Sequence, residues 1–330
     1  MPFLPVGGQA VIEGVMMRSP SRVAVAVRRM DGSIVFKERS FVSVTRRFKA
    51  LGLPVVRGAV SLFETLALGI GALNFSAAEA TRDATQAKSA GAAASNAPDA
   101  GRPSAPPAKP SALQGAGQLL IIAASLGLGI LLFVVLPARL TGWLGFHDRI
   151  GFGLVDGLFR LLAFIAYLLL ISQWKELARV LGFHGAEHKA IHALENRAPL
   201  TPESVQSFPR LHPRCGTSFL FLVVVISVVA FTFIGRPLGL RDHLLRIACM
   251  PLIAGVAFEF IRLSGKYADR PLVRALVWPG LQFQRLTTRE PDLAMCAVAI
   301  AALERVRGDE AVVALEARGA DARAEVAFVQ

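Results

Sequence analysis

Residues 218–234, which read SFLFLVVVISVVAFTFI, contain no charged side chain. A helix needs about 20 apolar residues to cross the roughly 30 Å hydrocarbon layer of a bilayer. This stretch therefore predicts a transmembrane helix, and three other segments of the chain are similarly long and apolar. The four predicted spans are residues 119–136, 152–171, 218–234 and 244–263.

The composition of the 330-residue chain also indicates a membrane protein. Hydrophobic residues make up 53% of it and charged residues 18%, and its mean hydropathy is +0.50, which is too apolar for an ordinary soluble domain. The net charge of +12 is explained by the basic residues that gather at the cytoplasmic margins of membrane proteins. Because no nucleic-acid module with interleaved aromatic residues is recognisable, we expect the lipid bilayer as a partner and no nucleic acid.

The distribution of Lys and Arg predicts the orientation in the membrane. The central segment, residues 173–217, carries six basic residues, whereas the short connections 137–151 and 235–243 carry two each. The amino-terminal region and the tail are also basic, and basic segments stay in the cytoplasm. The sequence thus predicts a multi-pass protein of the cytoplasmic (inner) membrane with both termini in the cytoplasm. No cleavable signal pattern is recognisable at the amino terminus, so we expect the spans to direct insertion.

The predicted fold class is mainly α: a polytopic membrane protein with about four transmembrane helices, a small N-terminal β-containing cytoplasmic unit and amphipathic cytoplasmic helices. Residues 1–52 form the basic β-containing unit, in which Asp31-Gly32 between two β-branched runs predicts a hairpin. Gly7-Gly8 is interpreted as a glycine-permitted turn leading into it.

The rest of the chain divides by composition. Residues 53–75 are apolar but contain Arg57 and Glu64, which predicts an amphipathic or half-inserted helix. A full crossing is the rival, and it would break the positive-inside pattern. Residues 76–117 are rich in Ala, Pro and Ser and predict a mobile linker. Residues 118–265 form the four-span membrane domain around the His/Cys segment 173–217, and residues 266–330 form a cytoplasmic tail with amphipathic helices.

A cluster of acidic and imidazole side chains marks the central segment. On a helix that continues from the second span, five side chains fall on one arc, since their spacing is i, i+3, i+4, i+8 and i+11. They are His184, Glu187, His188, His192 and Glu195. Imidazoles one turn apart share a divalent cation, and the H-x-x-E-H order is that of inverted zincins, with the glutamate as the base.

Two overlapping histidine pairs are therefore available. With His184 and His188 as ligands, Glu187 is the natural catalytic base; with His188 and His192, Glu195 joins as a ligand. We favour the first pair.

A second short piece supplies the remaining ligands. His212 and Cys215, followed by Gly216, have the two-residue gap of half a zinc knuckle, and zinc is the expected divalent metal. If both bind, the site is closed and structural; if one binds, an open position remains. Glu13 is a further candidate ligand or acid. Glu259, inside the fourth predicted span, is expected to pair with an arginine such as Arg262 or to reach towards the site.

Each of these features also has a simpler interpretation. The helical cluster can be an interfacial polar face, and the His-x-x-Cys turn an ordinary turn before a span. Together they favour a metal-dependent hydrolase that uses metal-activated water on a membrane-near peptide or a lipid-linked substrate. The alternative is a non-catalytic membrane scaffold or regulator with a structural zinc site. A transporter is disfavoured because only Glu259 is embedded.

Three stretches carry a resemblance to a known family: residues 7–18 (GGQAVIEGVMMR), 183–189 (FHGAEHK) and 212–219 (HPRCGTSF). In these the sequence resembles the YqhQ family of bacterial membrane proteins, over most of residues 6–290. The resemblance implies a multi-span inner-membrane protein that has been described as a predicted metal-dependent enzyme. It implies no particular substrate or reaction.

Overall fold

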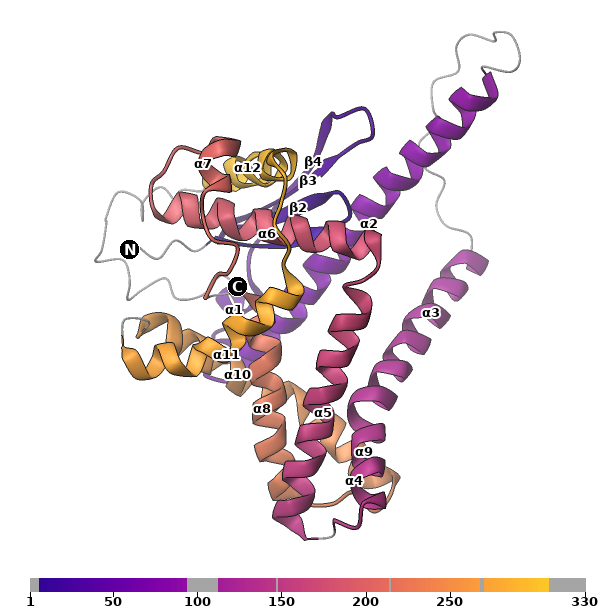
Figure 1. Cartoon of the computed structure of the whole chain (residues 1–330), viewed down its shortest axis with the longest axis vertical. Coiled ribbons are helices and arrows are strands. Elements are labelled where there is room, and N and C mark those ends of the chain that lie inside the picture. The colour runs from indigo at the N-terminus through magenta and orange to yellow at the C-terminus, as the bar shows by residue number, and fades with distance from the viewer. Residues whose placement is uncertain (1–5, 94–111, 147, 214, 268–269, 309–330) are drawn as a thin grey trace. The chain divides into compact units, whose positions relative to one another are not determined.

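The computed structural model describes residues 6–93, 112–146, 148–213, 215–267 and 270–308. The chain forms two compact units. The first unit takes in residues up to 83, residues 167–227 and residues from 249 onward, and the second takes in residues 84–166 and 228–248. The predicted fold class is confirmed: the chain is mainly helical and has one sheet near its amino terminus (Figure 1).

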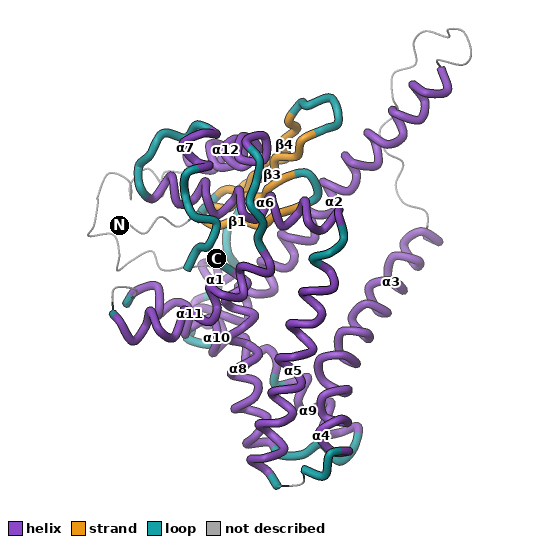
Figure 2. The backbone as a smooth tube through the Cα atoms, viewed as in Figure 1, coloured by secondary structure: helices purple, strands orange, loops and turns teal. Residues whose placement is uncertain are grey.

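Four strands in the first unit, drawn in orange in Figure 2, form an antiparallel sheet in the same order as in the chain. They are β1 (Gly7–Val11), β2 (Gly14–Arg18), β3 (Arg22–Arg28) and β4 (Ile34–Ser40). The hairpin predicted at Asp31-Gly32 is confirmed, since this turn joins β3 to β4. Gly32 has a φ of 84°, in the region that glycine adopts without a steric cost. Gly7-Gly8, in contrast, lies within strand β1 and is not a turn.

The two faces of the sheet are both covered, because successive side chains of a strand point to opposite sides. Val15 and Met17 of β2 belong to one hydrophobic cluster, together with residues of α6 (Lys175–Glu195) and α12 (Leu293–Arg307). Met16, between them, belongs to the other cluster, together with residues of α2 (Val56–Ala93). The sheet is thus packed between α2 and the α6–α12 pair.

The tail contributes a core helix to the first unit. The tail was predicted to form one or two amphipathic helices from Asp292 onward, and α12 is the first helix of this segment; its buried side chains include Cys296, Val298, Ala299 and Leu303. Asp292 caps its first turn by accepting a hydrogen bond from the Met295 amide at 2.7 Å. The predicted helical tail beyond residue 308 lies outside the described residues.

Five helices of the described chain are long and apolar enough to cross a membrane, judged by length and composition. Four of them coincide with the four predicted spans: residues 123–143, 149–171, 216–234 and 240–264. The fifth, residues 56–86, comes from the segment for which a full crossing was the rival interpretation. The four matching spans are built from α3 (Ala112–Ile130), η2 (Leu131–Val135), α4 (Leu136–Trp143), α5 (Arg149–Ile171), α8 (Gly216–Ile234), α9 (Leu240–Ala248) and α10 (Met250–Lys266).

The segment expected to be a linker, residues 76–117, is partly helical. Helix α2 continues to Ala93, and α3 begins at Ala112; residues 94–111 lie outside the described residues. Alanine has the highest helix propensity, and Ser76 and Glu79 are buried where α2 continues past the sheet. Composition alone did not reveal this support.

A buried ion cluster lies in the second unit. Asp156 of α5 accepts hydrogen bonds from Arg160, at 3.0 Å, and from Arg246 of α9, at 3.1 Å. Arg246 also donates to the carbonyl of Gly235 at 2.7 Å, and both guanidinium groups lie within 5 Å of the Phe231 ring, at 4.8 and 4.9 Å. We call Asp156, Arg160 and Arg246 the arginine–aspartate cluster. It joins α5 to α9 and to the end of α8.

Candidate metal centre

Helix α6 carries most of the candidate site, and two glycines let it approach its neighbours closely. A Cβ at Gly185 would lie 2.1 Å from the carbonyl oxygen of Arg289, and one at Gly182 would lie 2.9 Å from the Met295 sulfur. The backbone contact makes glycine necessary at position 185, whereas the flexible Met295 side chain can move away from position 182. This close contact with the connection between α11 (Pro271–Thr287) and α12 places His184 beside the end of α11.

His184, His188 and Cys215 form the first ligand group. One potential ligand atom from each lies within 4.8 Å of the other two. Nδ1 of His184 is 2.7 Å from the carbonyl of Thr287, and Nδ1 of His188 is 2.6 Å from the carbonyl of Arg210. A carbonyl oxygen only accepts hydrogen bonds, so each Nδ1 carries a hydrogen and a neutral ring presents a lone pair at Nε2. This arrangement is typical of histidines that bind a metal.

Cys215 completes the first ligand group at the beginning of α8. Its sulfur lies 3.2 Å from Nε2 of His184 and 3.4 Å from the amide of Thr217. Burial raises the pKa of the Cys215 thiol, but the charges of His188 and His184 outweigh it and hold the pKa well below its usual range. Burial likewise lowers the pKa of His184, yet the Cys215 thiolate raises it to about 9. The group thus favours a thiolate, the form that binds metals.

Glu187 lies beside the first ligand group but is not one of its three members. Its side chain is buried, and one carboxylate oxygen, Oε2, has no hydrogen-bond partner among the described residues. Burial raises the pKa of Glu187, which the charges of His188 and His184 oppose. An unpartnered buried carboxylate oxygen is costly, so this position calls for a proton, a water or a cation.

Gly8 explains how the sheet reaches Glu187. Its amide donates a hydrogen bond to the Glu187 carboxylate, and a Cβ at Gly8 would lie 2.9 Å from two carbons of that side chain. Only glycine lets strand β1 approach so closely. Nothing in the local sequence indicates this contact apart from the Gly7-Gly8 pair itself.

His192, Glu195 and His212 form the second ligand group, again with one potential ligand atom each within 4.8 Å of the others. Nε2 of His192 is 2.9 Å from the carbonyl of Leu211, and Nε2 of His212 is 3.4 Å from Glu195. Burial, followed by the charge of His188, lowers the pKa of His212 to about 3, so this ring is neutral. The rings of His188 and His212 are 5.8 Å apart between centroids, which makes the two groups neighbours.

The structure thus brings together seven of the nine candidate side chains and divides six of them between two groups. Cys215 joins His184 and His188, whereas His212 joins His192 and Glu195. Gln284 of α11, which the sequence did not single out, holds the loop that carries His212. Its side-chain oxygen accepts a hydrogen bond from the His212 amide at 2.8 Å, and its side-chain nitrogen donates to the His212 carbonyl at 2.7 Å. A glutamine within an apolar helix was the available signal.

Two of the candidates lie elsewhere. Glu13 is in the turn between β1 and β2, where its carboxylate accepts hydrogen bonds from Arg179 at 2.5 and 2.6 Å. Glu259 accepts from Arg57 at 2.6 and 2.5 Å, while Arg262 is 4.0 Å away. An arginine partner was expected for Glu259, but Arg57 comes from a helix about 200 positions earlier and provides the closer contact.

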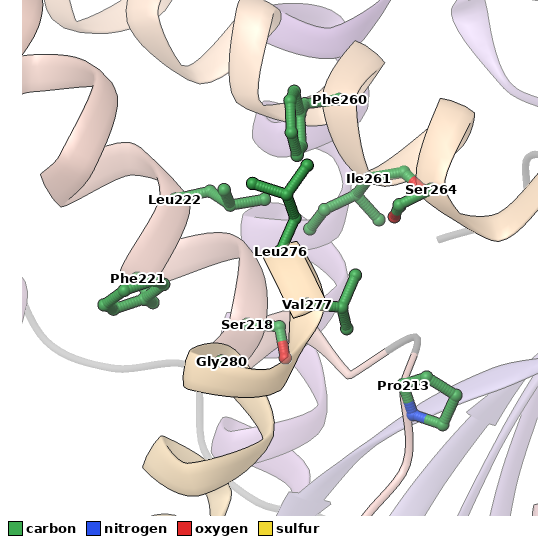
Figure 3. Close-up of a pocket in the computed structure, with 10 residues that line it drawn as sticks. All are labelled: Pro213, Ser218, Phe221, Leu222, Phe260, Ile261, Ser264, Leu276, Val277 and Gly280. Carbon is green, nitrogen blue, oxygen red and sulfur yellow. The ribbon is translucent and has the colours of Figure 1, made fainter. Parts of the chain in front are cut away.

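A small pocket lies beside the loop that carries His212 and Cys215 (Figure 3). Pro213 and Ser218 line it from that stretch of chain, and the remaining lining comes from α8, α10 and α11. These lining residues are Phe221, Leu222, Phe260, Ile261, Ser264, Leu276, Val277 and Gly280. The cavity has a volume of about 10 Å³, room for about one water molecule. Its walls are mainly apolar, but it is too small to hold a hydrocarbon chain.

Comparison with known proteins gives a family and no activity. The family described as "Protein of unknown function (DUF1385)" matches residues 53–309. The chain is 32% identical over 304 residues to a protein of Bacillus subtilis (strain 168) described as "Uncharacterized protein YqhQ", which covers 89% of each of the two chains. No solved structure matches.

Proposed function

The chain belongs to the DUF1385 family, and we propose that it is a multi-span membrane protein that binds a divalent metal, most naturally zinc, through His184, His188 and Cys215. We further propose that it is a metal-dependent hydrolase with Glu187 as its general base. The observation that carries the proposal is the unpartnered, buried Oε2 of Glu187 beside three converging ligand atoms.

The donor set fits zinc. Two imidazoles and one thiolate are ligands that zinc prefers, and catalytic zinc sites have three protein ligands and one open position. Without a metal, a proton between Nε2 of His184 and the Cys215 sulfur satisfies both atoms, and a divalent metal would bind in its place. A bound divalent metal would polarise a substrate carbonyl and make a water molecule more acidic.

The residues of the chain then have distinct roles. The carbonyls of Thr287 and Arg210 fix the tautomer and orientation of the two histidines. Glu187 accepts the proton of the attacking water at its Oε2, and its raised pKa suits a group that takes up a proton and later donates it to the leaving group. The Gly8 amide holds the other part of the carboxylate in place.

The place of the site in the chain supports a membrane-near substrate, either a peptide or a lipid-linked molecule. Cys215 directly precedes a candidate membrane span, residues 216–234. The basic central segment and tail support a site at the cytoplasmic face of the inner membrane.

Cobalt substitution tests the metal centre. In the purified protein, Co²⁺ is expected to give a thiolate charge-transfer absorption that Cys215→Ala abolishes. Cys296→Ala is the matched control, because Cys296 is also buried but donates to Gln206 and belongs to neither ligand group. Equal absorption in Cys215→Ala and wild type would refute the assignment. Total metal content near one or two per chain shows whether the second ligand group is also occupied.

A second measurement separates the hydrolase from its alternative, a scaffold or regulator with a closed structural zinc site. Azide is expected to change the visible spectrum of the cobalt protein by entering an open position, and Glu187→Gln should keep the cobalt but lose hydrolysis of lipid-linked esters. A spectrum that azide leaves unchanged would favour the closed site.

A further inference from the structure

Helix α2 has two different faces along residues 63–79. Leu68, Ala72, Ser76 and Glu79 are buried, and the first two pack into the hydrophobic cluster on the sheet. The opposite face is apolar and exposed: Phe63, Leu66, Ile70 and Leu73 are 60%, 56%, 48% and 38% exposed. Their spacing of three or four residues places them on one side of the helix.

Polar contacts strengthen the attachment of α2 to the sheet. Arg18 of β2 is 3.9 Å from Glu64, and Arg29, just after β3, donates to Glu79 at 3.0 Å. The Met30 amide donates to Asp83 at 2.8 Å. Residues 64–83 of α2 are therefore fixed to the sheet along about 20 residues, roughly 30 Å of helix at 1.5 Å per residue.

This attachment is incompatible with a transmembrane α2. An open sheet has edge strands with unpaired backbone groups, which do not occur in contact with the hydrocarbon layer. The part of α2 that packs on the sheet must then lie outside that layer. Residues 56–63 alone extend about 12 Å, well short of the roughly 30 Å required.

The start of α2 nevertheless lies beside a membrane helix. Arg57 pairs with Glu259 of α10, and a Cβ at Gly58 would lie 2.9 Å from the backbone of Gly255 and 2.8 Å from the Phe258 side chain. Because α10 is part of a candidate span, the exposed face of α2 begins next to a membrane-embedded surface.

The residues before α2 carry the charge expected at a membrane surface. Arg46 and Arg47 of α1 (Val44–Arg47) and Lys49 at the start of η1 (Lys49–Gly52) are exposed. The neighbouring Phe48 and Leu53 are exposed as well, at 55% and 58%. Basic side chains interleaved with exposed apolar ones bind the anionic headgroups and the upper acyl region of a bilayer.

We propose that α2 does not cross the membrane but lies on it, with the face formed by Phe63, Leu66, Ile70 and Leu73 buried in the bilayer interface. The bilayer is the occupant because the face continues from α10 and is flanked by Arg46, Arg47 and Lys49. Four candidate spans then remain, an even number that returns the chain to its original side. The sheet is held against the bilayer by α2.

The first test asks on which side each end of α2 lies. Ala50 and Ala84 are exposed, one before and one along α2, and each is replaced by cysteine in the full chain with the background change Cys249→Ser. Both Ala50→Cys and Ala84→Cys should react with a membrane-impermeant maleimide in vesicles of the same orientation. Reaction from opposite sides would show that α2 crosses.

The second test asks what covers the exposed face. Spin labels at Leu66→Cys and Ile70→Cys are studied in nanodiscs of phosphatidylethanolamine and phosphatidylglycerol, with Ala84→Cys as the control. Labels at 66 and 70 should collide several-fold more with oxygen than with a water-soluble nickel chelate, and the label at 84 should show the reverse. Preference for nickel at 66 and 70 would mean a solvated face, and collision with neither would mean a protein partner or a second copy; both results overturn the proposal.

Discussion

The first ligand group and the arginine–aspartate cluster are both buried and polar, but their atoms face in different directions. In the arginine–aspartate cluster, each guanidinium donates to the Asp156 carboxylate, so opposite charges face each other. In the first ligand group, His184 and His188 donate outward to backbone carbonyls, and their other nitrogens turn towards the Cys215 sulfur. The first arrangement places two donors opposite one acceptor, whereas the second places three potential ligand atoms around one point, where either a proton on His184 or a metal cation must lie.

This difference separates buried charges that hold helices together from buried side chains that are arranged to bind an ion. The buried charges of the arginine–aspartate cluster join helices, although Asp156 Oδ1 has no hydrogen-bond partner among the described residues and such charges add little net stability compared with apolar packing. Lone pairs that converge are unfavourable unless an ion or a proton lies among them. Burial alone therefore does not identify a functional site; the direction of the donors and acceptors does.

The largest expected effect is in the arginine–aspartate cluster. Asp156→Ala leaves two buried guanidinium groups without their shared carboxylate, which should lower the free energy of unfolding by about 3–5 kcal/mol. Chemical denaturation in detergent measures it. Asp148→Ala is the control, because Asp148 is exposed and only caps α5 through the Gly151 amide; its cost should be about 1 kcal/mol. Equal losses in both variants would contradict the role of the cluster.

A smaller loss of stability, seen only when zinc is present, is expected for His188→Ala. Zinc at a free concentration of about 100 times its Kd should stabilise the wild-type protein by about 2.7 kcal/mol, and this gain should vanish in the variant. In the presence of a chelator the two proteins should differ by much less. Denaturation with and without zinc measures the difference. A His188→Ala variant that zinc still stabilises would show that the first ligand group does not bind zinc through His188.

Gly8→Ala tests the contact between the sheet and the ligand helix. The added methyl group would lie 2.9 Å from Glu187 and 2.7 Å from the Met16 carbonyl oxygen, so we expect a loss of about 1–3 kcal/mol. Gly71→Ala is matched to it, because a Cβ there meets nothing within 4 Å and alanine favours a helix by roughly 1 kcal/mol. Thermal denaturation should move in opposite directions for the two variants.

The smallest effect is expected for Glu13→Gln, which removes the carboxylate that Arg179 of α6 contacts. The hydrogen bond from Arg179 lowers the pKa of Glu13 below its usual value of 4.5. A lowered pKa stabilises the fold above pH of about 4.5, and the contribution disappears as the pH falls through the folded-state pKa. At pH 7 the loss should be below about 1 kcal/mol. A wild-type advantage that persists unchanged at pH 3 would contradict the ion pair.

Local pattern was sufficient for the β3–β4 hairpin, four candidate spans and the candidate residues, but not for strand β1 or for the length of α2. The alternation around Asp31-Gly32 predicted the β3–β4 hairpin, and helical spacing predicted that His184, His188 and His192 would share one side of a helix. It was not sufficient for the partners. Nothing near Glu259 in the chain indicated Arg57, and nothing near Gly8 indicated Glu187, because each pair is joined only by packing between distant segments.

The hydrophobic cluster between the sheet and α2 was missed for the same reason. The apolar content of residues 53–75 fits a membrane helix as well as a surface helix, and only the contact of Leu68 and Ala72 with the sheet distinguishes the two. Similarly, the His-x-x-Cys spacing placed His212 and Cys215 together, yet the fold assigns them to different ligand groups. Side chains three residues apart in a turn can point in different directions.

The sequence by itself determined that this is a helical membrane protein with a hairpin-containing amino-terminal unit and a histidine-rich segment between spans, because hydropathy and periodicity are properties of the local chain. Only the tertiary structure decided which ligand atoms converge, which arginine meets Glu259 and which face of α2 remains exposed. These depend on contacts between residues tens to hundreds of positions apart, and such contacts are set by how the two faces of one small sheet are covered.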